Sequence, residues 1–195
     1  METIREKSFE DIYSHIIGEI ERGAVDRKHS FHLCFFSTFI DEFPESRTVV
    51  LRKLERSSFT LRFHTDSRSD KYKQVLSNKN TQILLYNQKA KLQVRLKCHS
   101  INLDDEKIKQ DVWNKSQEIS RRCYYVPSSP SSMIDKPILN SDIDFKNESL
   151  GYNVFSIIES NVLEMDVLEL NYEGHVRAKF EINNGKLIKA FWLMP

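Results

Sequence analysis

Several features are scarce in this sequence of 195 residues, and each scarcity excludes a class of protein. Five glycines and five prolines are too few for long low-complexity linkers. With 29 basic and 28 acidic residues the formal net charge is +1, so the basic excess of a nucleic-acid module is missing. No apolar run approaches membrane-spanning length, and the charged N-terminus lacks the apolar core of a signal peptide. We expect one cytoplasmic domain over 1–195, with neither nucleic acid nor membrane as a partner.

Cysteine is also scarce. Cys34, Cys98 and Cys123 are odd in number, far apart and without CxxC spacing, so neither a disulfide framework nor a zinc site is indicated. His29 with His32 and His64 with Asp66 are the nearest approaches to metal-ligand spacing, and no further ligand completes either pair, so no metal is expected. Glycine-rich nucleotide-binding and nucleophile-elbow motifs are absent, which leaves dinucleotide-fold, Walker-type and hydrolase functions without support.

The N-terminal segment predicts a helix over about 8–22. Ser8 followed by Asp11 is a helix-start pattern, and isoleucines at 12, 16, 17 and 20 form one apolar face. Gly23 is the expected stop. Such a helix packs on a sheet through its apolar face.

Most of the remaining chain has the texture of short strands rich in β-branched and aromatic residues. The spacing between them is mostly too short for crossover helices, which favours antiparallel pairing and a closed or nearly closed barrel with flanking helices. A helix is expected at 69–78, a helical stretch from Asp104, and a loop-rich segment at 126–149 that holds three of the five prolines. The nine expected strands are 31–39, 47–54, 59–65, 81–87, 92–103, 152–160, 162–172, 175–182 and 186–193.

One strand carries an arginine at an unexpected position. In S-R-T-V-V-L-R-K (46–53), Arg47 is in phase with Val49 and Leu51, which should face a core. At the other end Arg52 and Lys53 point to opposite faces, and strand parity with Arg47 favours Lys53. A bulge between them would bring Arg52 to the same face instead.

Basic and hydroxyl side chains recur near this strand in a pattern that suits a phosphate. Ser69 and Lys71 lie in the first turn of the 69–78 helix, where free N–H groups and the helix dipole favour an anion. Thr65 ends the preceding strand. If the strands of Arg47 and Thr65 form a hairpin, these groups converge. Taken singly, each basic residue is better explained as a solvated surface charge.

Four motifs follow one another along the chain. They are R-T-V-V-L-R (47–52), F-H-T (63–65) with S-D-K (69–71), L-L-Y (84–86) and Q-V-R-L (93–96). In order and spacing they resemble the pyridoxamine 5′-phosphate oxidase-like FMN-binding split barrels, and the similarity covers most of residues 30–195. W-N-K-S-Q-E-I-S-R (113–121) and H-V-R-A-K-F (175–180) extend it more weakly.

This resemblance implies an antiparallel split β-barrel that forms a homodimer, with FMN in clefts at the subunit interface. It favours Arg52 over Lys53 as the basic residue of the site. By position, the run 47–52 would follow the flavin, the F-H-T and S-D-K motifs would line it and hold its phosphate, and a late strand would reach in from the partner chain. The implied cofactor-binding residues are Arg47, Thr48, Val49, Val50, Leu51, Arg52, His64, Thr65, Ser69, Lys71, Gln93 and Lys179.

The sequence departs from the true oxidases at several positions. Asp70 stands where they have an arginine, and Leu170 stands where a tryptophan packs near their flavin. Their substrate-gripping Arg-Leu-His is not reproduced by H-V-R (175–177). We therefore expect a flavin-dependent oxidoreductase that does not oxidise pyridoxamine 5′-phosphate. A non-catalytic FMN carrier and a flavin-free dimeric scaffold are the alternatives.

Overall fold

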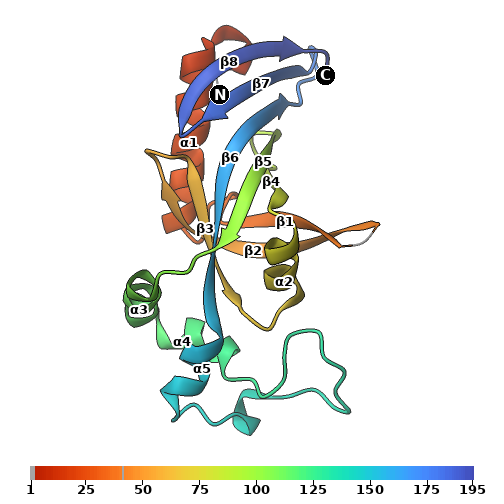
Figure 1. Cartoon of the computed structure of the whole chain (residues 1–195). Coiled ribbons are helices and arrows are strands. Elements are labelled where there is room, and N and C mark those ends of the chain that lie inside the picture. The colour runs from red at the N-terminus through yellow and green to blue at the C-terminus, as the bar shows by residue number, and fades with distance from the viewer. Residues whose placement is uncertain (1–2, 41) are drawn as a thin grey trace.

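The structure is a computed structural model that describes residues 3–40 and 42–195. Its centre is an antiparallel barrel of six strands in the order β3-β2-β1-β4-β5-β6, closed by pairing of β6 with β3. Strands β7 and β8 extend the sheet beyond β6 and arch over one end of the molecule, where both chain termini lie (Figure 1). The antiparallel barrel with flanking helices that the sequence predicts is confirmed.

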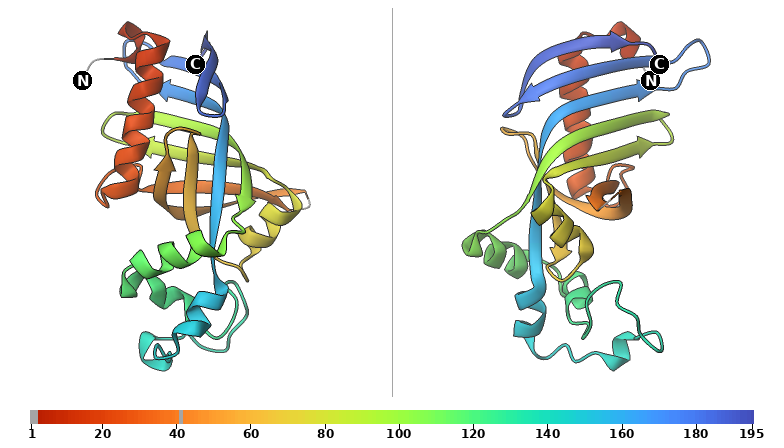
Figure 2. Two further views of the ribbon diagram at one scale, coloured as in Figure 1. Left: turned by 60° about the vertical axis from the view of Figure 1, so that its left-hand side comes forward. Right: turned by 45° about the vertical axis from the view of Figure 1, so that its right-hand side comes forward.

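The described residues form eight strands, and the prediction of nine was wrong at one place. The segments expected at 152–160 and 162–172 are one strand, β6, which runs most of the length of the molecule (Figure 2). Leu163 forms a β-bulge opposite Lys97 and Cys98, and the strand continues through this bulge without a turn. The strands are β1 (Leu33–Ile40), β2 (Phe43–Glu55), β3 (Thr60–Asp66), β4 (Asn80–Asn87), β5 (Leu92–Asn102), β6 (Phe155–Glu169), β7 (Val176–Asn183) and β8 (Lys186–Leu193).

The barrel interior and the apolar face of α1 (Phe9–Val25) share one core. Ser8 caps α1, accepting a hydrogen bond from the Asp11 N–H, as the sequence predicts. The helix does not stop at Gly23 but continues to Val25. A Cβ at position 23 would lie 2.8 Å from the Phe31 carbonyl carbon, so this glycine permits close packing and does not end the helix.

A second, smaller apolar cluster lies beyond the lower end of the barrel, around Trp113, Tyr124, Phe155 and Ile157. The helical stretch expected from Asp104 is divided, because Ser116 ends one helix and its carbonyl accepts a bond from the Arg121 side chain instead of continuing the ladder. In addition to α1, the helices are α2 (Asp70–Ser77), α3 (Glu106–Lys115), α4 (Glu118–Arg121) and α5 (Glu148–Val154). The 3₁₀ turns are η1 (Ile4–Glu6), η2 (Arg122–Tyr124) and η3 (Asn140–Asp142).

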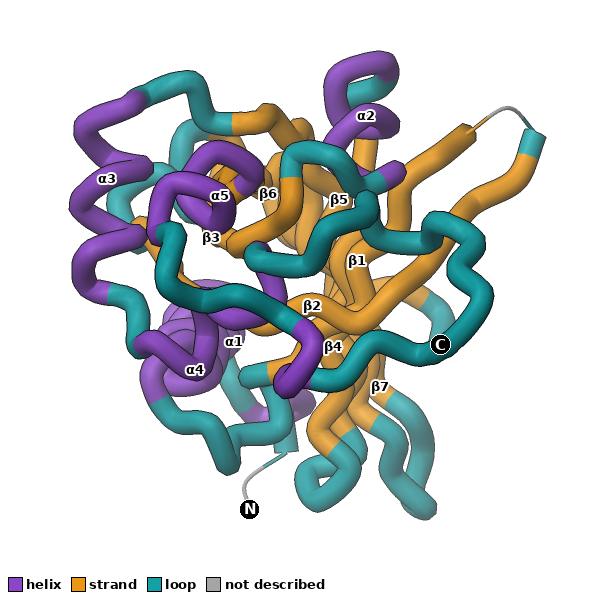
Figure 3. Tube along the Cα trace, turned by 90° about the horizontal axis from the view of Figure 1, so that it is seen from below, coloured by secondary structure: helices purple, strands orange, loops and turns teal. Residues whose placement is uncertain are grey.

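The loop-rich segment is confirmed over most of 126–149, where η3 is its one regular turn before α5 begins at Glu148. Arg68 holds its start by donating to the carbonyl oxygens of Val126 (3.1 Å) and Pro127 (3.5 Å). Viewed from below, the segment sweeps from the side of α3–α5 toward the β1–β2 hairpin (Figure 3). Within the described residues, no helix is both long and apolar enough to cross a membrane.

Candidate functional site

A cleft of about 310 Å³ lies at the N-terminal end of α2. Strand β2 supplies one wall, the first turn of α2 supplies another, and the loop-rich segment supplies the third. We call it the anion cleft. It is lined by Glu45, Ser46, Arg47, Ser69, Asp70, Lys71, Pro130 and Ser131.

The start of α2 leaves donors pointing into this cleft. Ser69 is the N-cap residue, but its side chain makes no capping bond. Its hydroxyl instead donates to the Asp66 carbonyl oxygen (2.6 Å) and lies 3.1 Å from the Thr65 hydroxyl. The first N–H groups of a helix have no partner within the helix, and the helix dipole adds partial positive charge there. The helix start therefore suits an anion.

Lys71 is the cation closest to this helix start. Its Nζ lies 3.4 Å from the Thr65 hydroxyl oxygen. Burial, followed by the charge of Arg47, lowers the pKa of Lys71, and the nearby carboxylates only partly oppose this. The ammonium is thus short of negative charge, which an incoming anion would supply.

Arg47 faces inward in phase with Val49 and Leu51, as expected, but near the open end of the barrel. Its guanidinium donates to the Glu45 carboxylate (2.9 Å) and the Gln74 side-chain oxygen (3.1 Å). Burial is the main cause that lowers the pKa of Arg47, and Glu45 opposes it. The charge that seemed out of place on a core-facing position therefore meets a carboxylate at the rim of the anion cleft.

Two acids offset the two cations of the cleft. Glu45 contacts Arg47, and Asp70 lies 3.8 Å from Lys73 and close enough to Arg47 and Lys71 to affect their pKa values. Both carboxylates are about half exposed, at 48% and 50% of their side-chain surface. Solvent weakens the hold of both carboxylates. Arg47 also donates to the backbone oxygens of Phe36 (3.3 Å) and Glu45 (2.9 Å) and to the Thr38 hydroxyl, so Lys71 is the cation of the cleft with more capacity left for a ligand.

The far end of the R-T-V-V-L-R strand contains the bulge that would reconcile strand parity with the motif. The pairing with β3 shifts register between Leu51 and Lys53, so Arg52 is the extra residue. Lys53 is exposed and pairs with Glu55 at 3.1 Å. Arg52 is half-buried, and its Nε is buried without a hydrogen bond to any described residue.

His64 lies on the side of β3 toward Arg52. Burial, and then the charges of Arg52 and Arg62, lower the pKa of His64 to about 3. Its ring meets Phe155 edge-on at 5.1 Å between centroids. At neutral pH this histidine is uncharged and can donate or accept one hydrogen bond without adding to the local positive charge.

The rest of the 47–52 run does not present one face to a ligand. Val49 and Leu51 are buried in the barrel. Thr48 and Val50 belong to the opposite, outer face of the sheet. If all six residues lie along a flavin, those whose side chains point away from it could contact it only through the strand backbone.

Gln93 and Lys179 are not brought to the anion cleft of their own chain. Cross-strand neighbours place Lys179 five strands from Thr48 on the outer face, about 24 Å along the sheet. Gln93 lies between Tyr86 and Leu168 on the same outer face. The outer-face row from β2 to β7 is Thr48, Phe35, Leu84, Arg95, Asp166 and Lys179.

Around Lys179 the outer face carries a second cleft of about 310 Å³, in which acids and bases alternate. Asp166 accepts from Arg95 (2.7 Å) and Arg177 (2.8 Å). Glu164 likewise lies between Lys97 (3.1 Å) and Lys179 (2.8 Å). We call these six residues the charge ladder.

The outer face next to the charge ladder is apolar. Leu33, Phe35 and Tyr86 expose 53%, 47% and 39% of their surface from β1 and β4. With Val50 and Leu84 as cross-strand neighbours of β1 residues, they form the outer apolar face. Contiguous exposed apolar side chains on a sheet face are a candidate surface for contact with another molecule.

Sequence reasoning missed several residues that line the anion cleft or contact its arginine. Glu45 is two residues before Arg47 and so on its strand face, and Gln74 is one helical turn after Asp70; these spacings could have revealed both. Pro130 and Ser131 come from the loop-rich segment, and no sequence signal connects them to the cleft.

Comparison with known proteins bears on this geometry. Residues 13–102 match the family model described as pyridoxamine 5′-phosphate oxidase, FMN-binding domain. The family resemblance is confirmed. The matched part of the pyridoxamine 5′-phosphate oxidase-like fold runs from α1 to the end of β5 and includes Arg47, Ser69 and Lys71. No curated protein matches the sequence.

Solved structures show the same fold. A pyridoxamine 5′-phosphate oxidase-related, FMN-binding protein from Nostoc punctiforme PCC 73102 has a TM-score of 0.71 at 20% identity, covering 93% of this chain and 96% of that one. PhzG from Burkholderia lata 383, in complex with tetrahydrophenazine-1-carboxylic acid, has a TM-score of 0.69 at 14% identity, covering 95% and 91%. A protein from Clostridium acetobutylicum related to general stress protein 26 has a TM-score of 0.58 at 11% identity, covering 90% and 97%.

Proposed function

We propose that the chain binds FMN at the interface of a homodimer and acts as a flavin-dependent oxidoreductase. One observation carries this proposal most: Arg47, Ser69 and Lys71 converge on the N-terminus of α2 inside a domain that matches an FMN-binding model. The proposed domain is the whole chain, of which residues 1, 2 and 41 lie outside the described residues.

The anion cleft would hold the phosphate of the flavin. Lys71 supplies a charge that burial has left poorly satisfied, and the first N–H groups of α2 supply hydrogen bonds. Ser69 fixes the start of this helix, because its hydroxyl and its N–H both donate to the Asp66 carbonyl oxygen. Arg52 offers a buried Nε with no partner among the described residues. An orphaned donor of this kind costs free energy unless a ligand accepts from it. Thr65 supports Ser69 and Lys71 from the end of β3.

A second copy of the chain would complete the site. Gln93 and Lys179 lie on the outer face, strands away from the anion cleft, so they would reach the flavin of the partner and not their own. The outer apolar face beside them supplies the surface that the partner would cover. A twofold arrangement uses the same patch on both subunits and creates two equivalent sites.

When bound, FMN would supply the hydride or electron transfer, and the protein would supply binding and orientation. The chain's own contributions follow from its geometry. His64 stays neutral at physiological pH, and the Pro130–Ser131 part of the loop-rich segment lies over the anion cleft. Loops in this position exclude water from a bound ligand.

Pyridoxamine 5′-phosphate is not the proposed substrate. Asp70 puts a negative charge where the oxidases have a cation. Arg177, the arginine of H-V-R, is bonded to Asp166 through two nitrogens and has little capacity left for a substrate anion.

A non-catalytic FMN carrier is a second candidate, and the charge of the anion cleft favours it. Arg47 and Lys71 are offset by Glu45 and Asp70, giving a formal sum of zero. A cleft without net positive charge binds a phosphate weakly and reversibly, which suits a carrier.

The first test is the visible spectrum of the purified full-length chain, with its mass in solution. We expect flavin absorption in a dimer at one FMN per chain. A colourless protein that takes up no added FMN would contradict both flavin proposals. A flavin-loaded monomer would contradict the shared site.

A second test separates oxidoreductase from carrier. The bound flavin is photoreduced without oxygen and then offered oxygen, quinones and nitroaromatic acceptors. Reoxidation by an acceptor at a saturable rate supports the enzyme. Reduced flavin that reacts with none of them faster than free FMN supports the carrier.

A further inference from the structure

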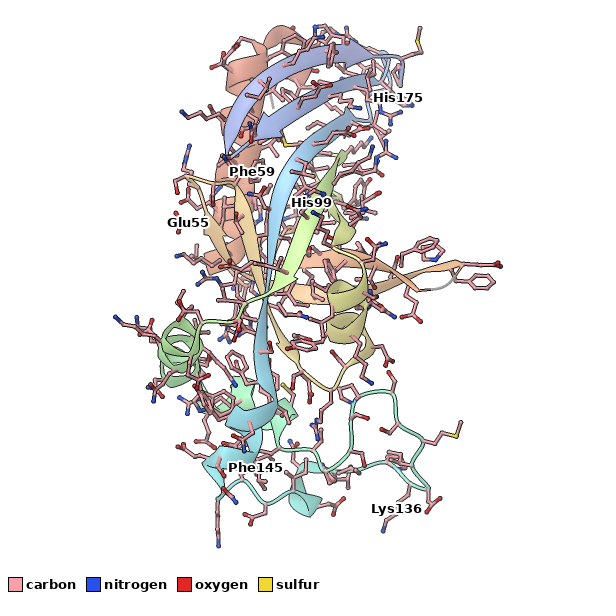
Figure 4. The ribbon with its side chains drawn as sticks, viewed as in Figure 1. Glu55, Phe59, His99, Lys136, Phe145 and His175 are labelled. Atoms are coloured by element: carbon pink, nitrogen blue, oxygen red, sulfur yellow. The ribbon has the colours of Figure 1, made fainter. Side chains whose placement is uncertain are left out.

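A larger cavity, of about 570 Å³, lies away from the anion cleft and shares no lining residue with it. Three segments surround it: η1 with the exposed side of α1, the β4–β5 turn, and the end of β6 with the residues after it. It lies toward the end of the molecule where the β6–β7 turn carries His175, opposite the end that holds Phe145 (Figure 4). We call it the α1 cavity.

The walls of the α1 cavity are fixed to one another by hydrogen bonds. Glu169 at the end of β6 accepts from the Thr3 hydroxyl (2.7 Å) and the Ile4 N–H (2.8 Å). The Leu170 N–H donates to the Lys91 carbonyl oxygen (3.0 Å), which joins the strand end to the β4–β5 turn. The cavity is therefore formed before any ligand arrives, which lowers the entropic cost of binding.

Positive charge surrounds this cavity. From α1, His15, Glu19 and Arg22 line it at spacings of four and three residues, which places them on one helix face. The β4–β5 turn adds Lys89 and Lys91, both exposed. Lys7 also lines the cavity, after η1.

The acids of the cavity are already engaged. Glu19 is buried and pairs with Arg22 and with His29 (3.3 Å). Glu169 is taken up by Thr3 and Ile4. In the described part of the chain, neither Lys89 nor Lys91 forms an ion pair. The cavity therefore presents a surplus of cations to a ligand.

The floor of the cavity is apolar. Ile4 and Leu92 are buried there, and Ala90 and Leu170 are half-buried beside them. An apolar floor beneath a basic rim matches a molecule with an apolar body and one anionic group, since few polar groups then fix its orientation. An inorganic anion would leave the apolar floor unused.

We propose that the α1 cavity binds a small organic acid, in which a carboxylate is joined to an apolar ring or chain. The carboxylate lies at the basic rim near Lys89 and Lys91, and the apolar body rests on Leu92 and Leu170. This site shares no lining residue with the anion cleft.

The test uses the full-length protein and the fluorescent anion anilinonaphthalene sulfonate. We expect saturable fluorescence that naphthoate displaces at least about tenfold more strongly than naphthalenemethanol, its uncharged analogue, because only the acid meets the basic rim. Equal displacement by the acid and the alcohol would overturn the proposal.

Variants locate the binding. Lys89→Glu with Lys91→Glu should weaken dye binding about tenfold, by charge reversal at two exposed positions. Lys107→Glu, on the exposed side of α3, is the matched control and should have no effect. Ala90→Trp should block binding by filling the floor. Unchanged binding in the double variant places the dye elsewhere, such as on the outer apolar face, and overturns the proposal even if Ala90→Trp fails to fold.

Discussion

The anion cleft and the charge ladder contain similar residues in opposite electrostatic states. In the charge ladder, the hydrogen bonds that Lys179 donates to Glu164 and Arg177 donates to Asp166 raise the pKa values of the two bases. In the anion cleft, burial lowers the pKa values of Lys71 and Arg47. Each of the four bases of the ladder is ion-paired with Glu164 or Asp166, whereas Lys71 of the cleft forms no ion pair with a described residue and could still be stabilised by an anionic ligand. The number of basic residues in a pocket is thus a weaker guide to anion binding than their unmet demand for negative charge.

The prediction with the largest expected effect concerns the charge ladder. Asp166→Ala leaves Arg95 and Arg177 without their carboxylate in a partly buried site. We expect the free energy of unfolding to fall by about 2–3 kcal/mol, below the range for fully buried pairs because both arginines are partly exposed. Urea denaturation measures it. Glu181→Ala, on the exposed side of β7, is the control and should change stability by less than about 0.5 kcal/mol.

The next prediction concerns the cleft. Lys71→Ala should weaken FMN binding by about 1.5–3 kcal/mol, the range for hydrogen bonds to charged groups, while changing stability by less than about 0.5 kcal/mol. Titration of flavin fluorescence gives the affinity. Lys73→Ala, on the exposed side of the same helix, should bind FMN nearly as the parent does. An equal loss in both variants would mean that only general helix charge matters, and the comparison fails.

A smaller effect is expected from His64, which is uncharged at neutral pH, on the pH dependence of stability. Because the pKa of His64 is about 3 in the folded chain and near 6.5 when unfolded, the unfolded state binds more protons between these values. His64 therefore makes the fold lose stability as pH falls below about 6.5, by up to about 1.4 kcal/mol per pH unit. His64→Gln should flatten this slope in urea titrations at pH 7, 6 and 5. An unchanged slope would assign it to His15 and His29, whose pKa values are also lowered.

The smallest effect asks whether Glu45 competes with a bound anion. Glu45→Gln keeps a hydrogen-bond acceptor for Arg47 but removes the charge. Since Glu45 is half exposed, FMN affinity should rise by only about 0.2–1 kcal/mol. Asp70→Asn should act in the same direction. If both substitutions weaken binding, the acids position the cations and do not compete with the ligand.

Much of the barrel follows from the sequence, because alternating apolar residues and short connections leave few options besides antiparallel strands. The joining of two predicted strands into β6 could not be foreseen, because it depends on a bulge at Leu163 that only the pairing with β5 creates. The division of the stretch after Asp104 likewise depends on bonds that the Arg121 side chain donates back to the Asn114 and Ser116 carbonyl oxygens, which helical periodicity does not reveal.

In the candidate site, too, some residues could be grouped from the sequence and others could not. Arg47, Thr65, Ser69 and Lys71 could be grouped from the sequence, because a hairpin and the helix after it bring them together locally. The position of Gln93 could not, because it depends on which face of a closed barrel each strand presents. Pro130 and Ser131 reach the cleft through a segment with no periodic pattern to predict its path.

The pairing that closes the barrel joins Thr60 to Asn161, a separation of 101 residues. During synthesis, strands β1 to β5 can pair with near neighbours, but the barrel must wait until β6 has emerged. At about 5–20 residues per second, this leaves roughly 5–20 seconds in which the edge of β3 is unpaired. Forming such distant contacts also slows folding, because the long loop must close first. The vulnerable moment for aggregation is therefore the late emergence of a single strand, and a chain truncated before β6 should be captured by chaperones while β3 is still open.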